Sequence, residues 1–172
     1  SLAEIEKDII NIDYQIDDFK KKLKAGELAR EMMKKSYLEI RDDFGPELNE
    51  KLLKKYNAIC NKEYNNILVS DEYEMNLIKD SSLLDYKLLS NGAKDQLFLA
   101  LRLSFIDMIF NKNDITIFLD DAFIQYADNK LKNVLNLLLK EDYGQQIIFT
   151  CQHREKKVFE DLTVDFNYIV LD

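Results

Sequence analysis

Apolar side chains recur at alternating intervals of three and four positions over the first 23 residues. They are Leu2, Ile5, Ile9, Ile12, Ile16, Phe19 and Leu23, and Glu, Asp and Lys fill most positions between them. This spacing is typical of the a/d seam of a left-handed coiled coil, which is the favoured prediction. One amphipathic helix packed on a globular domain would give a similar pattern.

Helical periodicity continues to Leu38 and stops shortly before Pro46. Proline is tolerated in the first turn of a helix, so Pro46 predicts the start of a second helix over 47–62. We therefore expect a coiled-coil arm at 1–44 and a separate head lobe at 45–172.

Beyond residue 62 the pattern changes to short alternating or fully apolar runs, interspersed with helical segments. Strands are predicted at 66–69, 74–78, 84–88, 115–119, 146–150 and 166–171, and helices at 94–110, 129–139 and 155–161. The run at 115–119 is almost entirely apolar, which is typical of a parallel strand covered on both faces. Because the second half alternates helix and strand, the expected fold class is α/β, with a largely parallel sheet and flanking helices.

The composition narrows the classes of function. The chain has 172 residues, of which 47% are hydrophobic, and a formal net charge of -8. It can bury one ordinary core, and a uniformly basic nucleic-acid-binding surface is excluded. No apolar run reaches the roughly 18–20 residues that a membrane helix needs. Since the chain begins with Ser inside a helical pattern, we expect it to be a piece of a longer protein.

The scarcity of Gly, His and Cys excludes several kinds of site. The four glycines are spaced too irregularly for a phosphate loop, G-x-x-x-x-G-K-[ST], or for a G-x-G-x-x-G dinucleotide loop. His153 is the only histidine, which excludes a zinc site with several histidines. Cys60 and Cys151 form no C-x-x-C pair, and two isolated thiols predict a reduced, cytoplasmic protein.

A buried strand that ends in two adjacent carboxylates is a candidate for chemistry. Asp120 and Asp121 directly follow the apolar run at 115–119. Ligands of open α/β sheets bind beyond the carboxyl ends of the strands, and neighbouring strand residues point to opposite faces. One carboxylate can therefore meet a cation while the other faces an attacking water, as in the Walker B pattern. A solvated turn that only ends the strand is the alternative.

Ser90-Asn91-Gly92 precede the predicted helix at 94–110. A hydroxyl, a helix cap and a glycine that permits close backbone approach together form an anion site, because the first N–H groups and the helix dipole favour negative charge. An ordinary N-cap explains the same residues equally well.

In their order along the chain, these segments resemble the C-terminal half of an ABC-type ATPase head of the SMC-like group. Residues 89–96 are similar to the ABC signature, Asp120-Asp121 to Walker B with its neighbouring catalytic acid, and 146–153 to the switch strand that ends in a histidine. The resemblance is to YhaN-like and SbcC-like proteins, and more distantly to RecF-like heads. It covers essentially the whole chain, and it implies that the heptad segment is the returning arm of a long coiled coil.

The resemblance assigns the first motif to nucleotide binding. Ser90 and Gly92, with Asn91 between them, match the signature residues that contact the γ-phosphate of ATP held by the opposite head. Asn91 stands where the family has the first signature glycine. The aspartate of the family's D-loop would fall on Ala127, and Asp128 follows one position later.

The resemblance assigns the second and third motifs to metal binding and hydrolysis. Asp120 matches the carboxylate that holds Mg²⁺ largely through water, and Asp121 stands where most members have the glutamate that polarises the attacking water. His153 matches the switch histidine that senses the γ-phosphate, although Gln152 adds one residue before it. A surface histidine in a polar turn is the alternative for His153.

Together these roles imply an ATPase that binds and hydrolyses Mg-ATP between two heads and acts in DNA maintenance or repair in the cytoplasm. The implied cofactors are ATP and Mg²⁺. The implied partners are an N-terminal lobe of the same protein, which would supply the phosphate loop, and a second head in a homodimer. DNA and a nuclease are further candidate partners, and no membrane is implied. Without a phosphate loop, this chain alone is expected to be inactive.

Two other classes of function remain open from the sequence. A degenerate head could bind nucleotide but serve as a dimerisation or scaffold module, which Asn91 and Ala127 favour. An unrelated coiled-coil interaction domain could contain Asp120-Asp121 by chance. The lysines between Lys20 and Lys35 are explained by a solvated helix face, or by DNA contact near the arm base.

Overall fold

The computed structural model describes residues 2–61, 64–70, 74–141 and 143–171; the side chains of the first helix are described at 9, 12–37 and 44–60. It divides into two compact units, Ser1–Phe44 and Gly45–Asp172, which are taken separately below. Within the described ranges, every helix falls short of the combined length and apolarity that a membrane span requires.

Helix α1 (Leu2–Cys60) runs without interruption and contains Pro46 in its interior. The predicted break between two helices before Pro46 is therefore wrong. Proline lacks an N–H and removes one helical hydrogen bond, which is a local cost. Helix formation is cooperative and continues across it, because the residues that follow, among them Leu52 and Tyr56, are buried and stabilise the helix by packing.

The predicted coiled-coil seam is exposed within the first unit. Phe19 is 67% exposed and Leu23 is 66% exposed, and Ile9, Ile12 and Ile16 are also on the surface. The seam positions Leu2 and Ile5 lie outside the described side chains. An apolar stripe of this length on a single helix favours association with another helix.

The basic stretch of the arm is partly neutralised by acids one turn earlier. Lys21 Nζ lies 2.9 Å from Asp17 Oδ2, and Lys22 Nζ lies 2.7 Å from Asp18 Oδ2. Such exposed pairs at positions i and i+4 stabilise a helix only slightly. They favour a solvated helix face over a DNA-binding surface for this stretch.

We expect the chain to self-associate through the arm, with a sedimentation or light-scattering mass above that of a monomer that rises with concentration. Ile16→Asp combined with Phe19→Asp should shift the mass toward the monomer, because both charges fall on the seam. Tyr14→Asp is the matched control, because Tyr14 is also exposed but lies off the seam. A monomeric wild-type chain at high concentration would contradict this prediction.

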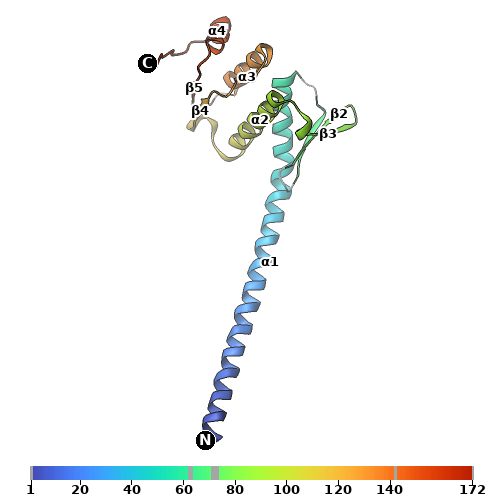
Figure 1. Cartoon of the computed structure of the whole chain (residues 1–172), viewed down its shortest axis with the longest axis vertical. Coiled ribbons are helices and arrows are strands. Elements are labelled where there is room, and N and C mark those ends of the chain that lie inside the picture. The colour runs from blue at the N-terminus through green and yellow to red at the C-terminus, as the bar shows by residue number, and fades with distance from the viewer. Residues whose placement is uncertain (1, 62–63, 71–73, 142, 172) are drawn as a thin grey trace. The chain divides into compact units, whose positions relative to one another are not determined.

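The second unit combines an antiparallel sheet and a parallel sheet with α-helices and short 3-10 segments (Figure 1). After the end of α1 the elements are β1 (Asn66–Val69), β2 (Met75–Lys79), β3 (Ser82–Asp85), η1 (Tyr86–Leu88), α2 (Asn91–Ile109), η2 (Lys112–Asp114), β4 (Thr116–Asp120), α3 (Asp128–Lys140), β5 (Gln145–Phe149) and α4 (Arg154–Asp161). The ends of each predicted element between 66 and 161 lie within three residues of these bounds. The strand predicted at 84–88 differs most from the structure, because β3 starts at Ser82, ends at Asp85 and is followed by a 3-10 turn.

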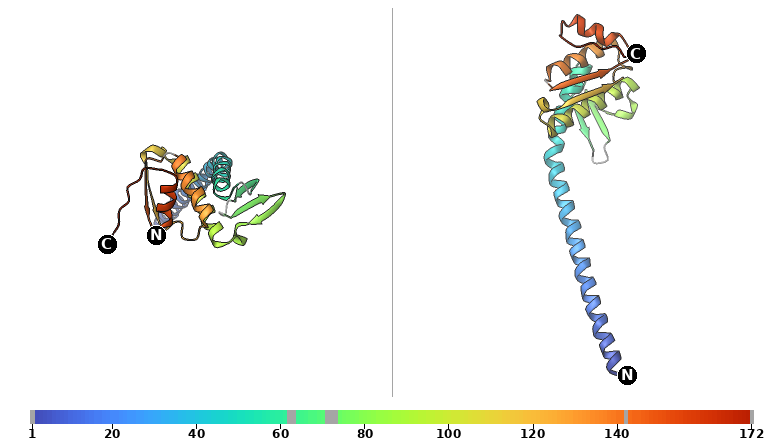
Figure 2. Two further views of the ribbon diagram at one scale, coloured as in Figure 1. Left: turned by 90° about the horizontal axis from the view of Figure 1, so that it is seen from above. Right: turned by 90° about the vertical axis from the view of Figure 1, so that its left-hand side faces the viewer.

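Strands β1, β2 and β3 form an antiparallel sheet, whereas β4 and β5 pair in parallel with Phe118 opposite Ile147. Helices α2 and α3 lie between the two sheets (Figure 2). Leu97, Leu103 and Leu135 from these helices belong to the main core cluster. The expected α/β fold class, with a parallel sheet and flanking helices, is confirmed.

Two details of the predicted parallel sheet are wrong. Strand β4 is buried on one face only, because Ile117 and Leu119 are buried while Phe118 is 65% exposed. The segment predicted as a strand at 166–171 forms no strand, and its apolar residues Ile169 and Val170 are exposed. An apolar, β-prone segment forms a strand only beside a partner strand, so its composition was not sufficient.

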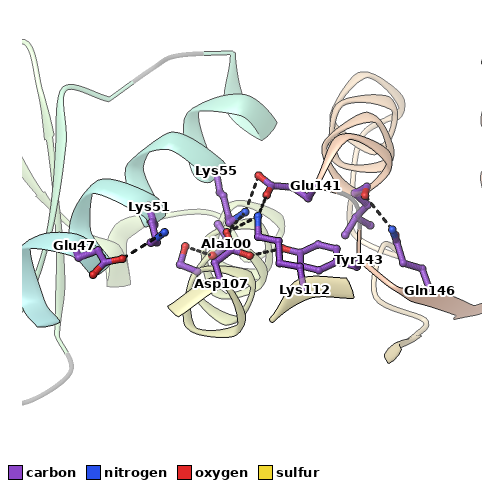
Figure 3. Close-up of polar contacts among 11 residues, drawn as sticks. Glu47, Lys51, Lys55, Ala100, Asp107, Lys112, Glu141, Tyr143 and Gln146 are labelled. Atoms are coloured by element: carbon purple, nitrogen blue, oxygen red, sulfur yellow. Dashed lines mark hydrogen bonds and ion pairs between the residues drawn. The ribbon is translucent and has the colours of Figure 1, made fainter. Parts of the chain in front are cut away.

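A group of four charged residues, with buried and partly buried side chains, joins α1, α2, η2 and the end of α3 (Figure 3). Lys55 Nζ lies 2.8 Å from Asp107 Oδ2 and 2.7 Å from Glu141 Oε1. Lys112 pairs with the same two carboxylates, and Tyr143 donates its hydroxyl hydrogen to Asp107 Oδ1 at 3.0 Å. The side chain of Lys55 is only 2% exposed and that of Asp107 only 6% exposed.

The ionised forms of this group are stabilised by one another. Burial alone would raise the pKa of Asp107 and of Glu141, but hydrogen bonds from Lys55 and Lys112 outweigh it and hold both pKa values below the ordinary range. Burial would lower the pKa of Lys112, but its bonds to Glu141 and Asp107 outweigh that effect and raise it. The network therefore fixes the position of α1 against α2 by paired charges rather than by apolar contact alone.

Candidate functional site

The first candidate motif lies at the start of α2. Ser90 is the N-cap residue, and its hydroxyl accepts a hydrogen bond from the N–H of Ala93 at 3.3 Å. Asn91 is the first residue of the helix and has no left-handed backbone conformation, so its side chain is tolerated in place of glycine without strain. Ser90 and Asn91 are both exposed. The N–H groups at the first turn of a helix, together with the helix dipole, favour an anion.

Gly92 is held close to the turn that follows β4. A Cβ atom at Gly92 would lie 2.6 Å from the carbonyl oxygen of Gln125, which is closer than real Cβ contacts. Glycine is therefore required here by packing within this unit of the chain. The same contact brings the start of α2 against the turn after Asp121.

The two aspartates stand at the end of β4 beside a cavity of about 430 Å³. The cavity lies between α2 and β4, with Arg102 on its α2 wall and Phe118 on its β4 wall. Asp120 is the last residue of the strand and is exposed. Asp121 has a left-handed backbone with φ of 45°, a conformation that aspartate tolerates better than most residues.

Asp121 is bonded to the end of β5. Its N–H donates to the carbonyl oxygen of Phe149 at 2.9 Å, and its Oδ1 accepts from the N–H of Cys151 at 3.3 Å. The first bond fixes the backbone of Asp121, and the second orients its carboxylate. The Walker B-like and switch-like segments are therefore in contact in this structure.

His153 directly precedes α4 and is exposed, and its side chain makes no capping bond. Within the described chain, no hydrogen bond joins the His153 side chain to Asp120 or Asp121. Ala127 is the N-cap residue of α3, likewise without a side-chain bond, and the Asp128 side chain is 92% exposed. Asp128 is thus the first residue of α3, directly after Ala127.

Arg154 makes several contacts next to the candidate site, and the sequence patterns did not single it out. It lies at the start of α4, and its guanidinium donates to the carbonyl oxygens of Phe123, Ile124 and Tyr126. It is also 3.6 Å from Asp128 Oδ1. In the sequence, only its position directly after His153 pointed to Arg154. The carbonyl oxygens that accept its hydrogen bonds are backbone atoms about 30 residues away, and no side-chain pattern reveals them.

The chemistry of the site fits a magnesium ion that takes most of its ligands from a nucleotide. Within the described residues, no cluster of three acidic, His or Cys side chains surrounds one point. Mg²⁺ in nucleotide sites is commonly held by one or two carboxylates, phosphate oxygens and water. The exposed carboxylate of Asp120 beside the cavity can supply one such ligand.

Comparison with known proteins shows what this chain is similar to. No family model matches it. It is 28% identical over 118 residues to the uncharacterized protein YhaN of Bacillus subtilis (strain 168), and the match covers 66% of this chain and 12% of that protein. The chain therefore spans about an eighth of the length of this relative.

Solved structures of SMC heads share the fold. A structure of the SMC head bound to the C-terminal winged-helix domain of ScpA matches with a TM-score of 0.58 and 13% identity, over 72% of this chain and 40% of that one. A structure from work on ATP-driven dimerization and DNA-stimulated activation of SMC ATPases matches with a TM-score of 0.50 and 14% identity, over 69% of this chain and 77% of that one. The chain has the fold of part of an SMC head, and the expected resemblance to this group is confirmed.

Proposed function

We propose that this chain is the C-terminal lobe of an SMC-like ATPase head, which binds and hydrolyses Mg-ATP between two heads. The observation that supports this is the meeting of three motifs at one turn. The turn at 121–127 begins with Asp121, which is bonded to Cys151 of the switch-like segment, and its Gln125 carbonyl lies against Gly92 of the signature-like segment. Motifs that are far apart in sequence are therefore neighbours at the carboxyl edge of the parallel sheet.

In this proposal each motif acts on a different part of the nucleotide. Asp120 holds Mg²⁺, which neutralises charge on the phosphates when bound. Asp121 orients the attacking water, and its carboxylate is aimed by the Cys151 N–H. His153 donates a hydrogen bond to the γ-phosphate, while Ser90 and the N–H groups at the start of α2 bind the γ-phosphate held by the opposite head.

The partners and setting are part of the proposal. A lobe that contains a phosphate loop must complete each site, because the glycines of this chain cannot form one. A second copy of the head supplies the opposite signature. DNA, a nuclease and a role in DNA maintenance in the cytoplasm enter the proposal by analogy of fold.

Ser90→Arg in the complete protein tests the division of labour between two heads. The added side chain fills the space of the γ-phosphate, so ATP binding by a single head should remain nearly intact. ATP-driven head dimerisation should be lost and turnover should fall tenfold or more, since charge-assisted hydrogen bonds are worth roughly 1.5–3 kcal/mol each. Ser82→Arg is the matched control, because Ser82 is an exposed serine of β3.

Mixing the Ser90→Arg protein with a protein mutated in the phosphate loop provides the complementary measurement. A mixed dimer retains one intact composite site, so about half of the wild-type activity per mixed dimer should return. No recovery from two folded proteins would contradict action across the dimer. A complete protein with no turnover above that of its Asp121→Asn variant would instead favour a scaffold module, which the exposed Ala127, without a side-chain capping bond, also fits.

A further inference from the structure

Arg154 binds the turn between β4 and α3 through its backbone. The guanidinium donates to three of the four carbonyl oxygens from Phe123 to Tyr126, with Nη2 3.2 Å from that of Ile124. The planar fork of arginine offers five N–H donors in fixed directions, which lets one side chain satisfy several acceptors. Because it bonds to several carbonyl oxygens at once, Arg154 stabilises the backbone conformation of the whole turn.

The fourth carbonyl of this run points elsewhere. The oxygen of Gln125 lies against Gly92, where even a methyl group would be too close at 2.6 Å. A change in the turn would therefore move the surface on which the start of α2 rests. The aromatic rings of Phe123 and Tyr126 are buried and lie 5.6 Å apart, which anchors the inner side of the turn while Arg154 holds its backbone.

The turn also determines where Asp121 stands. Asp121 is its first residue and has a left-handed backbone, and the N–H of Ile124 lies 3.5 Å from the Asp121 carbonyl oxygen. Sparsely populated backbone conformations persist only where the surroundings hold them. Arg154 holds this turn from the α4 side, and the β5 end holds it through Phe149 and Cys151.

We propose that Arg154 is a positioning residue of the nucleotide site: its guanidinium fixes the β4–α3 turn and so sets Asp121 and the start of α2 for catalysis. This inference rests on the proposed function. Arg154 directly follows His153, so the proposed phosphate-sensing residue is next in the chain to the residue that holds the turn carbonyls. The switch-like segment and the signature-like segment are thereby linked within a single head.

The positioning role is tested first without nucleotide, by hydrogen exchange of the 172-residue chain. In Arg154→Gln, backbone amides of the turn at 121–127 should exchange about tenfold or more faster, because hydrogen bonds from a charged donor are lost. Amides of α3 should keep their protection. Arg154→Lys should not restore the turn, because one ammonium cannot reproduce the fork, and Lys157→Gln is the matched control for charge loss on α4.

Turnover of the complete protein then separates positioning from folding. Arg154→Gln should lower kcat about tenfold or more per folded molecule, while ATP binding by a single head stays within about twofold. Arg154→Lys should show the same split, and Lys157→Gln should behave as wild type. A purely structural role would lower the folded fraction and leave kcat per folded molecule unchanged.

The outcomes distinguish this inference from the proposed function. A wild-type protein without ATP turnover overturns the proposed function, while the exchange measurement still decides whether Arg154 holds the turn. Unchanged exchange at 121–127 in Arg154→Gln overturns the inference. Faster exchange with unchanged kcat in an active protein also overturns it, because the turn would then have no part in catalysis.

Discussion

Replacing Lys55 by Met is expected to lower the free energy of unfolding by about 3–5 kcal/mol, which is typical when one partner of a buried ion pair is removed. Lys55 Nζ is within 2.8 Å of Asp107 and 2.7 Å of Glu141, and the side chain is 2% exposed. Its removal leaves the buried carboxylate of Asp107 and the partly buried carboxylate of Glu141 with Lys112 as their remaining cation in this group. Urea unfolding at pH 7, followed by circular dichroism, measures the change.

Lys54→Met is the matched control for this prediction. Lys54 occupies the neighbouring position of α1 and is exposed, so the same change of charge and shape should alter stability by less than about 0.5 kcal/mol. A Lys55→Met variant as stable as the Lys54→Met variant would show that the network contributes no net stability.

The pH dependence of the free energy of unfolding is a second test of this ion-pair network. The lowered pKa values of Asp107 and Glu141 stabilise the fold above the ordinary carboxyl range, and this contribution is lost as pH falls through about 4 and below. The raised pKa of Lys112 stabilises the fold below the ordinary lysine range and is lost as pH rises above about 10. The difference between wild type and Lys55→Met should therefore shrink at acid pH, where the two carboxylates are protonated.

Much of the second unit could be predicted from the sequence because its elements have strong periodicity. The apolar run of β4 and the amphipathic pattern of α3 indicate both the type and the approximate bounds of these elements. The helix break predicted at Pro46 was wrong because the preference of proline for the first turn of a helix considers only neighbouring residues. Helix α1 continues through Pro46 because the residues that follow it are packed in the core. The exposed face of Phe118 could not be predicted, because an apolar strand does not specify how many of its faces are covered.

The site was only partly predictable for a similar reason. Ser90 and Asp120 stand out because a helix start and a strand end are visible in the sequence. Arg154 and Lys55 do not stand out, because their partners are about 30 and more than 50 residues away and several are backbone atoms. The contribution of such a polar residue can be recognised only after the fold has brought its hydrogen-bond or ion-pair partners beside it.

Gly92→Ala is expected to lower the free energy of unfolding by about 1–3 kcal/mol, the usual cost of forcing extra volume into a packed site. The new Cβ would lie 2.6 Å from the Gln125 carbonyl oxygen, and a backbone atom cannot move away as the end of a flexible side chain can. Either the start of α2 or the turn at 121–127 must shift. Thermal or urea unfolding measures the loss.

Gly26→Ala separates this contact from the general effect of alanine in a helix. Gly26 is also helical, but nothing lies within 4 Å of the position of its Cβ. Alanine should therefore raise helix stability there by up to about 1 kcal/mol, so the two substitutions should have opposite signs. If Gly92→Ala were also stabilising, the turn and the start of α2 would be free to separate, and the contact that unites the proposed site within one head would not exist. A destabilised Gly92→Ala chain with faster amide exchange at 121–127 would instead show that this glycine is required by the turn, whether or not a nucleotide is bound.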